Sequence, residues 1–477
     1  MLKSIIQKEI LDHLYSLRFI VGLILSISVT VTCVVILTHD YEQELTDYNE
    51  RIVMQDDFLN NYAHTNRLGP MIRAQEPPEI FRPFIIGVQK DADLGSFDDN
   101  PLPVLFPPLD LVFIVTIILS LMALLFSYDA VCGERENSTL KLMLSNSIPK
   151  AGILLGKWIG GSITLFIPFL LSLLVGALYV ILHPSIHWDG AAWMTFILFI
   201  LASVTFVSVF HLLGLLVSAF SRISSISILT CLFVWVLLVL AIPNLSPYIA
   251  AQFFRIPSVN RIEKEVSRLT GVERDALGRQ LTAEIRQRYE TEYGKPFAEF
   301  QSMDQQAILS RLRTDESFRS MVEAYRDETD NAWMEANRIQ GEKADAISRE
   351  LTMKADTQTG VAKHIACLSP YANFVYLATD LTGTGLRGMD YFNQSVGVFS
   401  QTFNPYLERK VQQARETDPL FNSESFIDLS DRPRFAFKEE SVKDKLTAVL
   451  PYWGILLFFN ILFFTIAFIG FLKYDVR

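Results

Sequence analysis

Cysteine is scarce in this chain, which has four among its 477 residues. Cys33 and Cys231 lie inside long apolar runs, whereas Cys132 and Cys367 lie in polar segments far apart in the sequence. The long polar segment 243–445 contains only Cys367 and cannot close a disulfide within itself. Packing therefore has to hold that segment together.

Basic charge is also low for a protein that binds nucleic acids. The chain has 42 Lys and Arg against 52 Asp and Glu, which gives a net charge of −10 and a pI near 5.3. A nucleic-acid-binding protein would show a basic face. We therefore expect no nucleic-acid partner.

The motifs of several enzyme classes are absent. The sequence has no G-x-x-x-x-G-K-[ST] phosphate loop, no H-E-x-x-H zinc motif and no G-x-S-x-G nucleophile elbow. The string nearest to a phosphate loop, Gly152–Lys157, has the wrong spacing and precedes a tryptophan. We expect no catalytic residue, no enzyme activity of the chain itself and no cofactor, so energy from ATP would have to come through another subunit.

One short segment could suggest a metal site. His183 and His187 are followed by Asp189, but Pro184 stands between the histidines and further ligands are missing. Structural zinc takes four ligands, and copper sites also use Cys or Met. A surface loop is the better interpretation, and we predict no metal site.

Long apolar runs are what the chain has in abundance, with 50% hydrophobic residues and a mean hydropathy of +0.27. A bilayer core is crossed by about 20 apolar residues in helical form. Six runs approach or exceed this length, and none contains Asp, Glu, Lys or Arg. The sequence therefore predicts an all-α integral membrane protein with six transmembrane helices. The predicted spans are 19–37, 111–127, 158–182, 191–220, 223–242 and 446–472.

Lys and Arg in the short polar segments predict the orientation of these spans. The loop 183–190 has neither residue. Lys and Arg instead occur in four places, namely 1–18, 128–157, Arg222 and the tail 473–477. Both termini are therefore expected in the cytoplasm, and the long segments 38–110 and 243–445 are expected outside it.

Two of the polar segments have simple expected structures. Residues 1–18 carry an apolar stripe that predicts an amphipathic helix lying on the membrane surface. Segment 38–110 is rich in Pro and Gly, so we expect it to be mostly irregular, with a short helix near residues 43–62.

The segment 243–445 has a helical pattern over its first half. Apolar residues recur at helical spacing and stop at Gly271 and again at Gly294. The pattern from 315 to 353 predicts a helix of roughly 55–60 Å in a stalk or hairpin, and we expect Gln340 on it to be exposed. Shorter helices are expected over 368–445.

The cytoplasmic loop 128–157 carries the most informative pattern. A charged turn, Gly133–Glu136, precedes a short helix with Leu140, Met143 and Leu144 on one side. A short amphipathic helix at this place can dock into a groove on a soluble partner, although it could also lie on the inner leaflet.

This loop resembles the G-E-R-E-x-x-T-L-x-x-x-L-S pattern of exporter-type ABC transporter permeases. Ser138 stands where the family usually has glycine, a mild departure from the pattern. The amphipathic leader and the six-span layout are similar as well. The two long insertions resemble those of a branch named for multi-copper-enzyme maturation or gliding-type systems.

The resemblance implies a coupling role for the loop, which would contact the subunit that hydrolyses ATP. The residues to which it assigns this role are Gly133, Glu134, Arg135, Glu136, Thr139, Leu140 and Met143. It also implies a bacterial inner (plasma) membrane location, two ATPase subunits, and a second permease chain that is identical or homologous.

Two further features are candidates on physical grounds. Gly152, Gly156 and Gly160 recur every four residues, which favours close helix packing over simple hinge flexibility. His211 is the strongly polar residue of the predicted spans, and either a functional site or a hydrogen-bonded contact between helices explains such a residue.

The leading interpretation is a permease that exports or extracts an unidentified, lipophilic or amphipathic substrate. A second interpretation is a mechanotransmitter that passes ATPase movement to an extracytoplasmic envelope partner and moves no substrate. A third, a membrane-anchored enzyme, lacks a recognisable nucleophile or metal cluster in the sequence.

Overall fold

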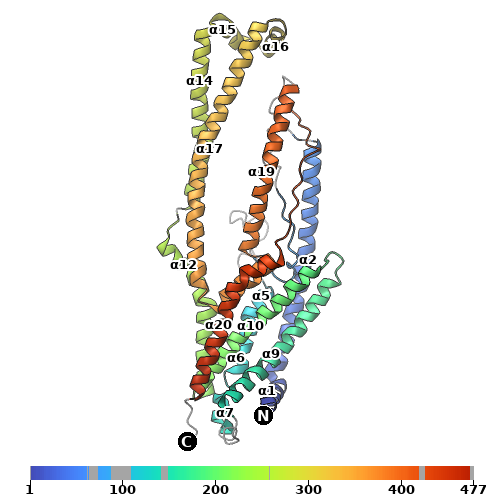
Figure 1. Cartoon of the computed structure of the whole chain (residues 1–477), viewed down its shortest axis with the longest axis vertical. Coiled ribbons are helices and arrows are strands. Elements are labelled where there is room, and N and C mark those ends of the chain that lie inside the picture. The colour runs from blue at the N-terminus through green and yellow to red at the C-terminus, as the bar shows by residue number, and fades with distance from the viewer. Residues whose placement is uncertain are drawn as a thin grey trace. The chain divides into compact units, whose positions relative to one another are not determined.

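The computed structural model describes residues 2–61, 63, 74–87, 109–140, 149–256, 258–417 and 425–472. Within these ranges the chain forms helices and no β-strand (Figure 1), as the sequence predicted. Most of the segment 62–108 that was expected to be irregular, the tail 473–477 and Met143 lie outside the described residues. The described chain divides into two compact units, one made of 1–243 and 366–477 and the other of 244–365.

Within the described residues, six helices are long and apolar enough to cross a membrane, and each overlaps one of the predicted spans. Two of them contain π-helical turns in the middle, within Leu111–Glu136 and within Ser224–Phe253. The helices are α2 (Leu17–Asn61), α5–η1–α6 (Leu111–Phe113, Ile114–Leu119 and Ser120–Ser127), α9 (Lys150–Ile181), α10 (Gly190–Phe220), α11–η2–α12 (Ser224–Trp235, Val236–Ala241 and Ile242–Phe253) and α20 (Val442–Leu472).

Helix α10 lies at the centre of the first unit. It packs against α6, α9, α11, α18 and α20. A helix that is apolar on every side is stable when other helices surround it, and Phe206, Val209 and Phe210 are fully buried. Asp189 caps this helix by accepting a hydrogen bond from the Ala192 N–H at 2.8 Å.

The leader forms α1 (Leu2–Leu14), which packs along α9. Ile5 and Glu9 are its buried residues, whereas Leu2 is exposed. Leu14, a residue of the expected apolar stripe, is partly buried against the main core.

Helix α2 differs from the expectation of a span followed by a separate short helix. It runs without a break for 45 residues, from the apolar run into the polar sequence that follows Leu37. The stretch 38–61 contains neither Pro nor Gly, so nothing in it ends the helix.

The segment 366–441 returns to the first unit. Helix α18 (Pro370–Thr382) begins at a Ser369 cap and buries Phe374, Leu377 and Leu381 in the main core. Helix α19 (Leu386–Thr417) has 32 residues and is shorter than the 51-residue α17 (Glu316–Ala366).

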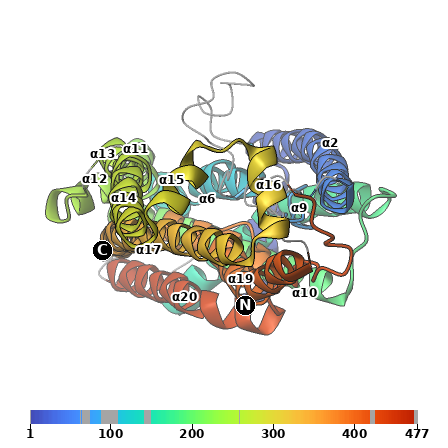
Figure 2. The same ribbon diagram turned by 90° about the horizontal axis from the view of Figure 1, so that it is seen from above.

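The second unit is a helical hairpin. Its first arm comprises α13 (Val259–Ser267), η3 (Arg268–Glu273) and α14 (Arg274–Tyr293), so Gly271 does not end the helix as expected. Helices α15 (Lys295–Ser302) and α16 (Gln305–Thr314) connect this arm to α17 (Glu316–Ala366), as Figure 2 shows from above.

Aromatic residues pack together at the end of the hairpin where α15 and α16 connect its two arms. Tyr289, Phe297 and Phe318 are buried in one cluster, and the Tyr289 hydroxyl donates to Glu328 at 3.1 Å. On α17, Gln340 is 6% exposed, so the expectation that it is freely accessible is wrong.

Candidate functional site

The loop that follows α6 folds into a turn and the short helix α7 (Cys132–Glu136). The Ser218 hydroxyl on α10 accepts hydrogen bonds from the backbone N–H groups of Val131 and Cys132, at 2.9 and 3.0 Å. These bonds satisfy backbone donors at the start of α7, which has no cap of its own. The charged turn is therefore fixed against α10.

Arg135 contacts the end of α10. Its Nη1 donates to the Ser221 carbonyl at 2.9 Å and its Nη2 to the Ala219 carbonyl at 3.4 Å. A cation at this position is favourable because the carbonyls at a helix C-terminus carry partial negative charge.

Glu136 contacts the start of the next helix, α11. It accepts hydrogen bonds from the Ser224 N–H at 3.0 Å and from the Ser224 hydroxyl at 2.6 Å. A carboxylate is favourable at a helix N-terminus. Adjacent residues of opposite charge therefore hold the two sides of the turn between α10 and α11.

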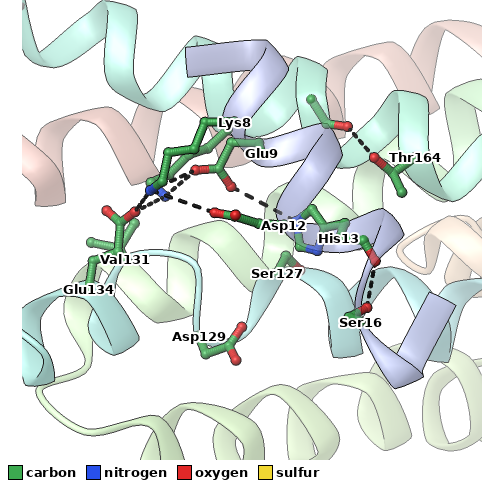
Figure 3. A network of polar contacts seen from close by, with 12 residues as sticks. Lys8, Glu9, Asp12, His13, Ser16, Ser127, Asp129, Val131, Glu134 and Thr164 are labelled. Carbon is green, nitrogen blue, oxygen red and sulfur yellow. Dashed lines mark hydrogen bonds and ion pairs between the residues drawn. The ribbon is translucent and has the colours of Figure 1, made fainter. Parts of the chain in front are cut away.

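Glu134 points away from this turn, towards α1 and α9. Its Oε1 lies 2.8 Å from Lys157 Nζ and 3.0 Å from Lys8 Nζ. Lys157 Nζ also lies 2.8 Å from Glu9 Oε1. Figure 3 shows Lys8, Glu9 and Glu134 converging on this point.

The two lysines and two glutamates form a charge network in which every member except the half-exposed Lys8 is nearly buried. The Lys157 side chain is 2% exposed, that of Glu9 8% and that of Glu134 14%. Burying charge is costly unless the charges are paired closely, and here each buried charge has an opposite partner. The network joins α1, the loop and α9.

The titratable groups of α1 respond to this environment. Burial alone would lower the pKa of Lys8, but its hydrogen bond and attraction to Glu134 raise that pKa above its ordinary value. Burial lowers the pKa of His13, which packs edge-on against Phe126 with ring centroids 5.1 Å apart. Burial thus favours the neutral form of His13.

A second group of contacts, made by Arg18, joins the start of α2 to the loop. Arg18 donates to the Leu125 carbonyl, the Tyr128 hydroxyl and Asp129, each at 2.9 Å. Its guanidinium also lies over the Tyr128 ring, 5.0 Å from the centroid.

The position at which the sequence departs from the family pattern has an unusual backbone. Ser138 has φ of 60°, the left-handed region that favours glycine. The adjacent Thr139 is exposed, and its hydroxyl donates to the Glu134 carbonyl at 3.2 Å. This geometry explains why glycine suits position 138.

Leu140 does not offer an apolar surface to a partner, which corrects the sequence-based expectation. It is fully buried in a small cluster with Ile5, Val131, Ile153 and Phe471. Met143, which was assigned the same role, lies outside the described residues.

The three spaced glycines have different surroundings. A Cβ added to Gly156 would lie 2.6 Å from Ile5, and one added to Gly160 would lie 2.8 Å from Glu9 and 3.2 Å from the Ile6 carbonyl. Both glycines therefore allow α1 to approach α9 closely. A Cβ on Gly152 would meet only Pro149, at an ordinary 3.5 Å.

His211 lies on α10, separate from the charge network. It is 1% exposed, and neither ring nitrogen has a hydrogen-bond partner within the described residues. Its ring fills the space beside Gly161, where an added Cβ would lie 2.6 Å away. The contact between α9 and α10 is thus close at this point.

The described residues contain no group of three or more His, Cys, Asp and Glu placed to bind a metal ion. His183 lies 3.3 Å from Glu42, whose carboxylate also accepts from Ser185 at 3.2 Å.

Comparison with known families decides what this arrangement belongs to. The model of a family described as ABC-2 family transporter protein matches residues 3–475, nearly the whole chain. The chain belongs to the ABC-2 transporter family. It is accordingly an ABC transporter permease with several membrane-crossing helices.

Two curated relatives of this ABC-2 permease bear the name probable ABC transporter permease protein NosY. The one from Stutzerimonas stutzeri is 38% identical over 69 residues, which are 14% of this chain and 25% of the relative. The one from Pseudomonas aeruginosa is 35% identical over 75 residues, 16% of this chain and 27% of the relative. The matches span about a quarter of the length of these relatives.

The sequence interpretation missed three members of the ABC-2 permease's charge network, namely Lys8, Glu9 and Lys157. Lys157 stands directly before an apolar run, and a charge at that place is a signal that a partner is needed. Glu9 and Lys8 did not reveal the network, because their partners in the loop and in α9 lie more than 100 residues away.

Proposed function

We propose that this chain is the membrane subunit of an inner-membrane ABC exporter whose loop 128–157 couples to ATPase subunits. Both termini would face the cytoplasm, with two ATPase subunits bound there and a second, identical or homologous permease chain beside this one. Family membership and the lack of a phosphate loop in the sequence support a separate ATPase.

The proposal rests on one observation: the three charged residues of the turn contact different helices. Glu134 is paired with lysines of α1 and α9, Arg135 with the end of α10, and Glu136 with the start of α11. A force applied to the loop would therefore act on four helices together. Such a connection is what a coupling element needs, because the loop cannot shift without moving or breaking these contacts.

The same contacts divide the assigned residues into two groups. Glu134, Arg135 and Glu136 would position the loop, whereas a partner would touch the exposed stretch Asn137–Thr139. Gly133 keeps the turn compact, since a Cβ there would lie 3.3 Å from Asp129. Among the described residues of the loop, the proposed docking surface is therefore Asn137–Thr139.

The substrate is proposed to be amphipathic or lipophilic and to be exported or extracted from the membrane. The spans are apolar, and the described part of α10 carries His211 as its one ionisable residue between Gly190 and Phe220. Transport coupled to ions usually needs ionisable groups within the spans, so ATP is the more reasonable energy source.

The second unit favours an alternative function, mechanotransmission to an envelope partner. Its 51-residue helix α17 and its arm α14 form a long hairpin with an aromatic core at one end. In vesicles without any envelope protein, stimulation of ATP turnover by an added amphiphile would favour transport. Turnover that responds only to an envelope partner would favour mechanotransmission.

The docking surface can be tested with the variant Asn137→Arg, Thr139→Arg, because both side chains are exposed and their replacement leaves the buried contacts intact. Co-expressed with the ATPase, this variant should insert normally, lose co-purifying ATPase and lose ATP turnover by the complex. The matched control is Asn331→Arg, Thr352→Arg, the same residue types on exposed positions of α17. Normal assembly and turnover in the loop variant would refute the coupling role.

A further inference from the structure

A cavity of about 130 Å³ lies between the polar half of α2 and α19, and none of the residues that line it belongs to the charged loop. An apolar cavity of about 150 Å³ accommodates a benzene ring, so this one has room for a single ring or a short alkyl group. Its lining residues include Asp56 and Leu59 of α2, Ala74, Phe399 and Phe403 of α19, and Arg432, Arg434 and Phe435.

Aromatic rings form the apolar wall of this cavity. The Phe399 ring lies 5.4 Å from the Phe403 ring and 5.4 Å from the Phe435 ring, measured between centroids. Such walls favour a flat or branched apolar group, which gains from burial and from ring contacts.

Charge on the other wall favours an anion. Among the lining residues, Asp56 is the single carboxylate and Arg432 and Arg434 are two guanidinium groups. Arg432 is nearly buried and is held by Asp56, by Asn60 at 2.7 Å and by the Leu429 carbonyl at 3.0 Å. It therefore serves the fold.

Arg434 is in a different position. Its guanidinium lies 3.4 Å from Asp56, a carboxylate already engaged by Arg432, and its side chain is 71% exposed. Among the described residues that line the cavity, one positive charge at its edge is thus in excess. A guanidinium can bind a further carboxylate through two parallel hydrogen bonds.

The location determines where a ligand would come from. Ile52, which also lines the cavity, follows Leu37 by fifteen residues on the unbroken helix α2. At 1.5 Å per residue, the cavity begins about 22 Å beyond the apolar run, farther than lipid headgroups of a bilayer extend. A dissolved molecule can reach it more readily than a membrane lipid.

We propose that this cavity binds a small anionic amphiphile, in which a ring-sized apolar group is attached to a carboxylate. The apolar group lies against Phe399, Phe403 and Phe435, and the carboxylate pairs with Arg434. The proposal adds a ligand site to the first unit and does not depend on ATPase docking.

The test uses the full chain in phosphatidylcholine nanodiscs and a photoreactive aryl-diazirine benzoate, with the uncharged aryl-diazirine benzyl alcohol as the matched probe. Labelled peptides are mapped by mass spectrometry. The benzoate should label peptides containing Phe399, Phe403 or Phe435 in a saturable way, and excess phenylacetate should compete. Arg434→Gln should reduce this labelling about tenfold or more.

Two further variants make the outcome decisive. Ala74→Trp fills the cavity without changing its charge and should also abolish saturable labelling, whereas Arg409→Gln, at an exposed position of α19, should leave it unchanged. Equal labelling by the alcohol and the benzoate, labelling that Arg434→Gln does not alter, or competition only by phosphatidylglycerol added to the discs would overturn the proposal.

Discussion

Lys157 shows, at the scale of single residues, how a charge next to a membrane span can be tolerated. Its ammonium group is held between two carboxylates, 2.8 Å from each, and is almost inaccessible to water. The cost of burying it is offset only while Glu9 and Glu134 remain in place. The residue therefore links the leader to the loop.

Replacing this lysine should be strongly destabilising. Lys157→Met leaves Glu9 and Glu134 with Lys8 as their one remaining lysine and with His13 3.9 Å from Glu9, and removal of one partner from a buried pair typically costs about 3–5 kcal/mol. The thermal unfolding midpoint of the purified chain in detergent should fall clearly, whereas Lys3→Met, at an exposed position of α1, should change little.

A compensating variant separates charge from packing. Adding Glu9→Gln and Glu134→Gln to Lys157→Met removes the unpaired carboxylates and should restore part of the lost stability. If Lys157→Met alone unfolds at the same temperature as the unaltered chain, the network does not support the fold.

A substitution at Ser138 should stabilise the protein, in contrast to Lys157→Met. A side chain at φ near +60° costs roughly 1–2 kcal/mol, part of which glycine gives back through its more flexible unfolded chain. Ser138→Gly should therefore raise the free energy of unfolding by about 0.5–1 kcal/mol. The neighbouring Asn137 has φ of −80°, so Asn137→Gly should lower it. A destabilised Ser138→Gly protein would show that the backbone is not left-handed there.

At the scale of helices, the close approach of α1 to α9 depends on two glycines with no room for a side chain. Gly160→Ala would place a Cβ 3.2 Å from the Ile6 carbonyl and closer still to Glu9. We expect α1 to detach, which limited proteolysis should detect as faster cleavage near Tyr15, and stability to fall. Gly152→Ala meets only ordinary contact, so its cleavage rate should match that of the unaltered chain; equal rates for both variants would contradict the packing.

The sequence predicted which helices exist better than it predicted their contacts. Six uncharged runs are a strong signal because the backbone must be satisfied within each helix. The continuation of α2 past Leu37 was missed because polarity was taken as the end of the helix, although no Pro or Gly stands there. The clamp of Arg135 on α10 joins residues more than 80 positions apart, which no local pattern reveals.

The sequence located the candidate site because its loop resembles a family pattern. It did not predict which helix each charged side chain of the loop contacts. The pattern identified Glu134, Arg135 and Glu136 but gave them one shared role, whereas each contacts a different helix. Leu140 was assigned to a partner because its helix pattern looked amphipathic. Periodicity shows that one side is apolar, but it does not show whether the same chain covers that side.

For the whole molecule, the orientation in the membrane can be measured by cysteine labelling. Lys343 on α17 is exposed, unlike the neighbouring Gln340. Lys343→Cys should react with an impermeant maleimide in intact cells, because the Lys and Arg residues of the short loops predict that the second unit lies outside the cytoplasm. Ser4→Cys on α1 should react only after permeabilisation. The reverse labelling pattern would show that the predicted orientation in the membrane is wrong.

The central claim is that the loop after α6 contacts an ATPase subunit. It is tested most directly by placing a photoreactive amino acid at Thr139, which is exposed at the end of the charged turn. In membranes that contain the co-expressed ATPase, irradiation should cross-link this position to the ATPase, whereas the same amino acid at Thr352 of α17 should not. Cross-linking from Thr352 in place of Thr139, or none from Thr139 while the ATPase is bound to the membrane, would contradict the claim.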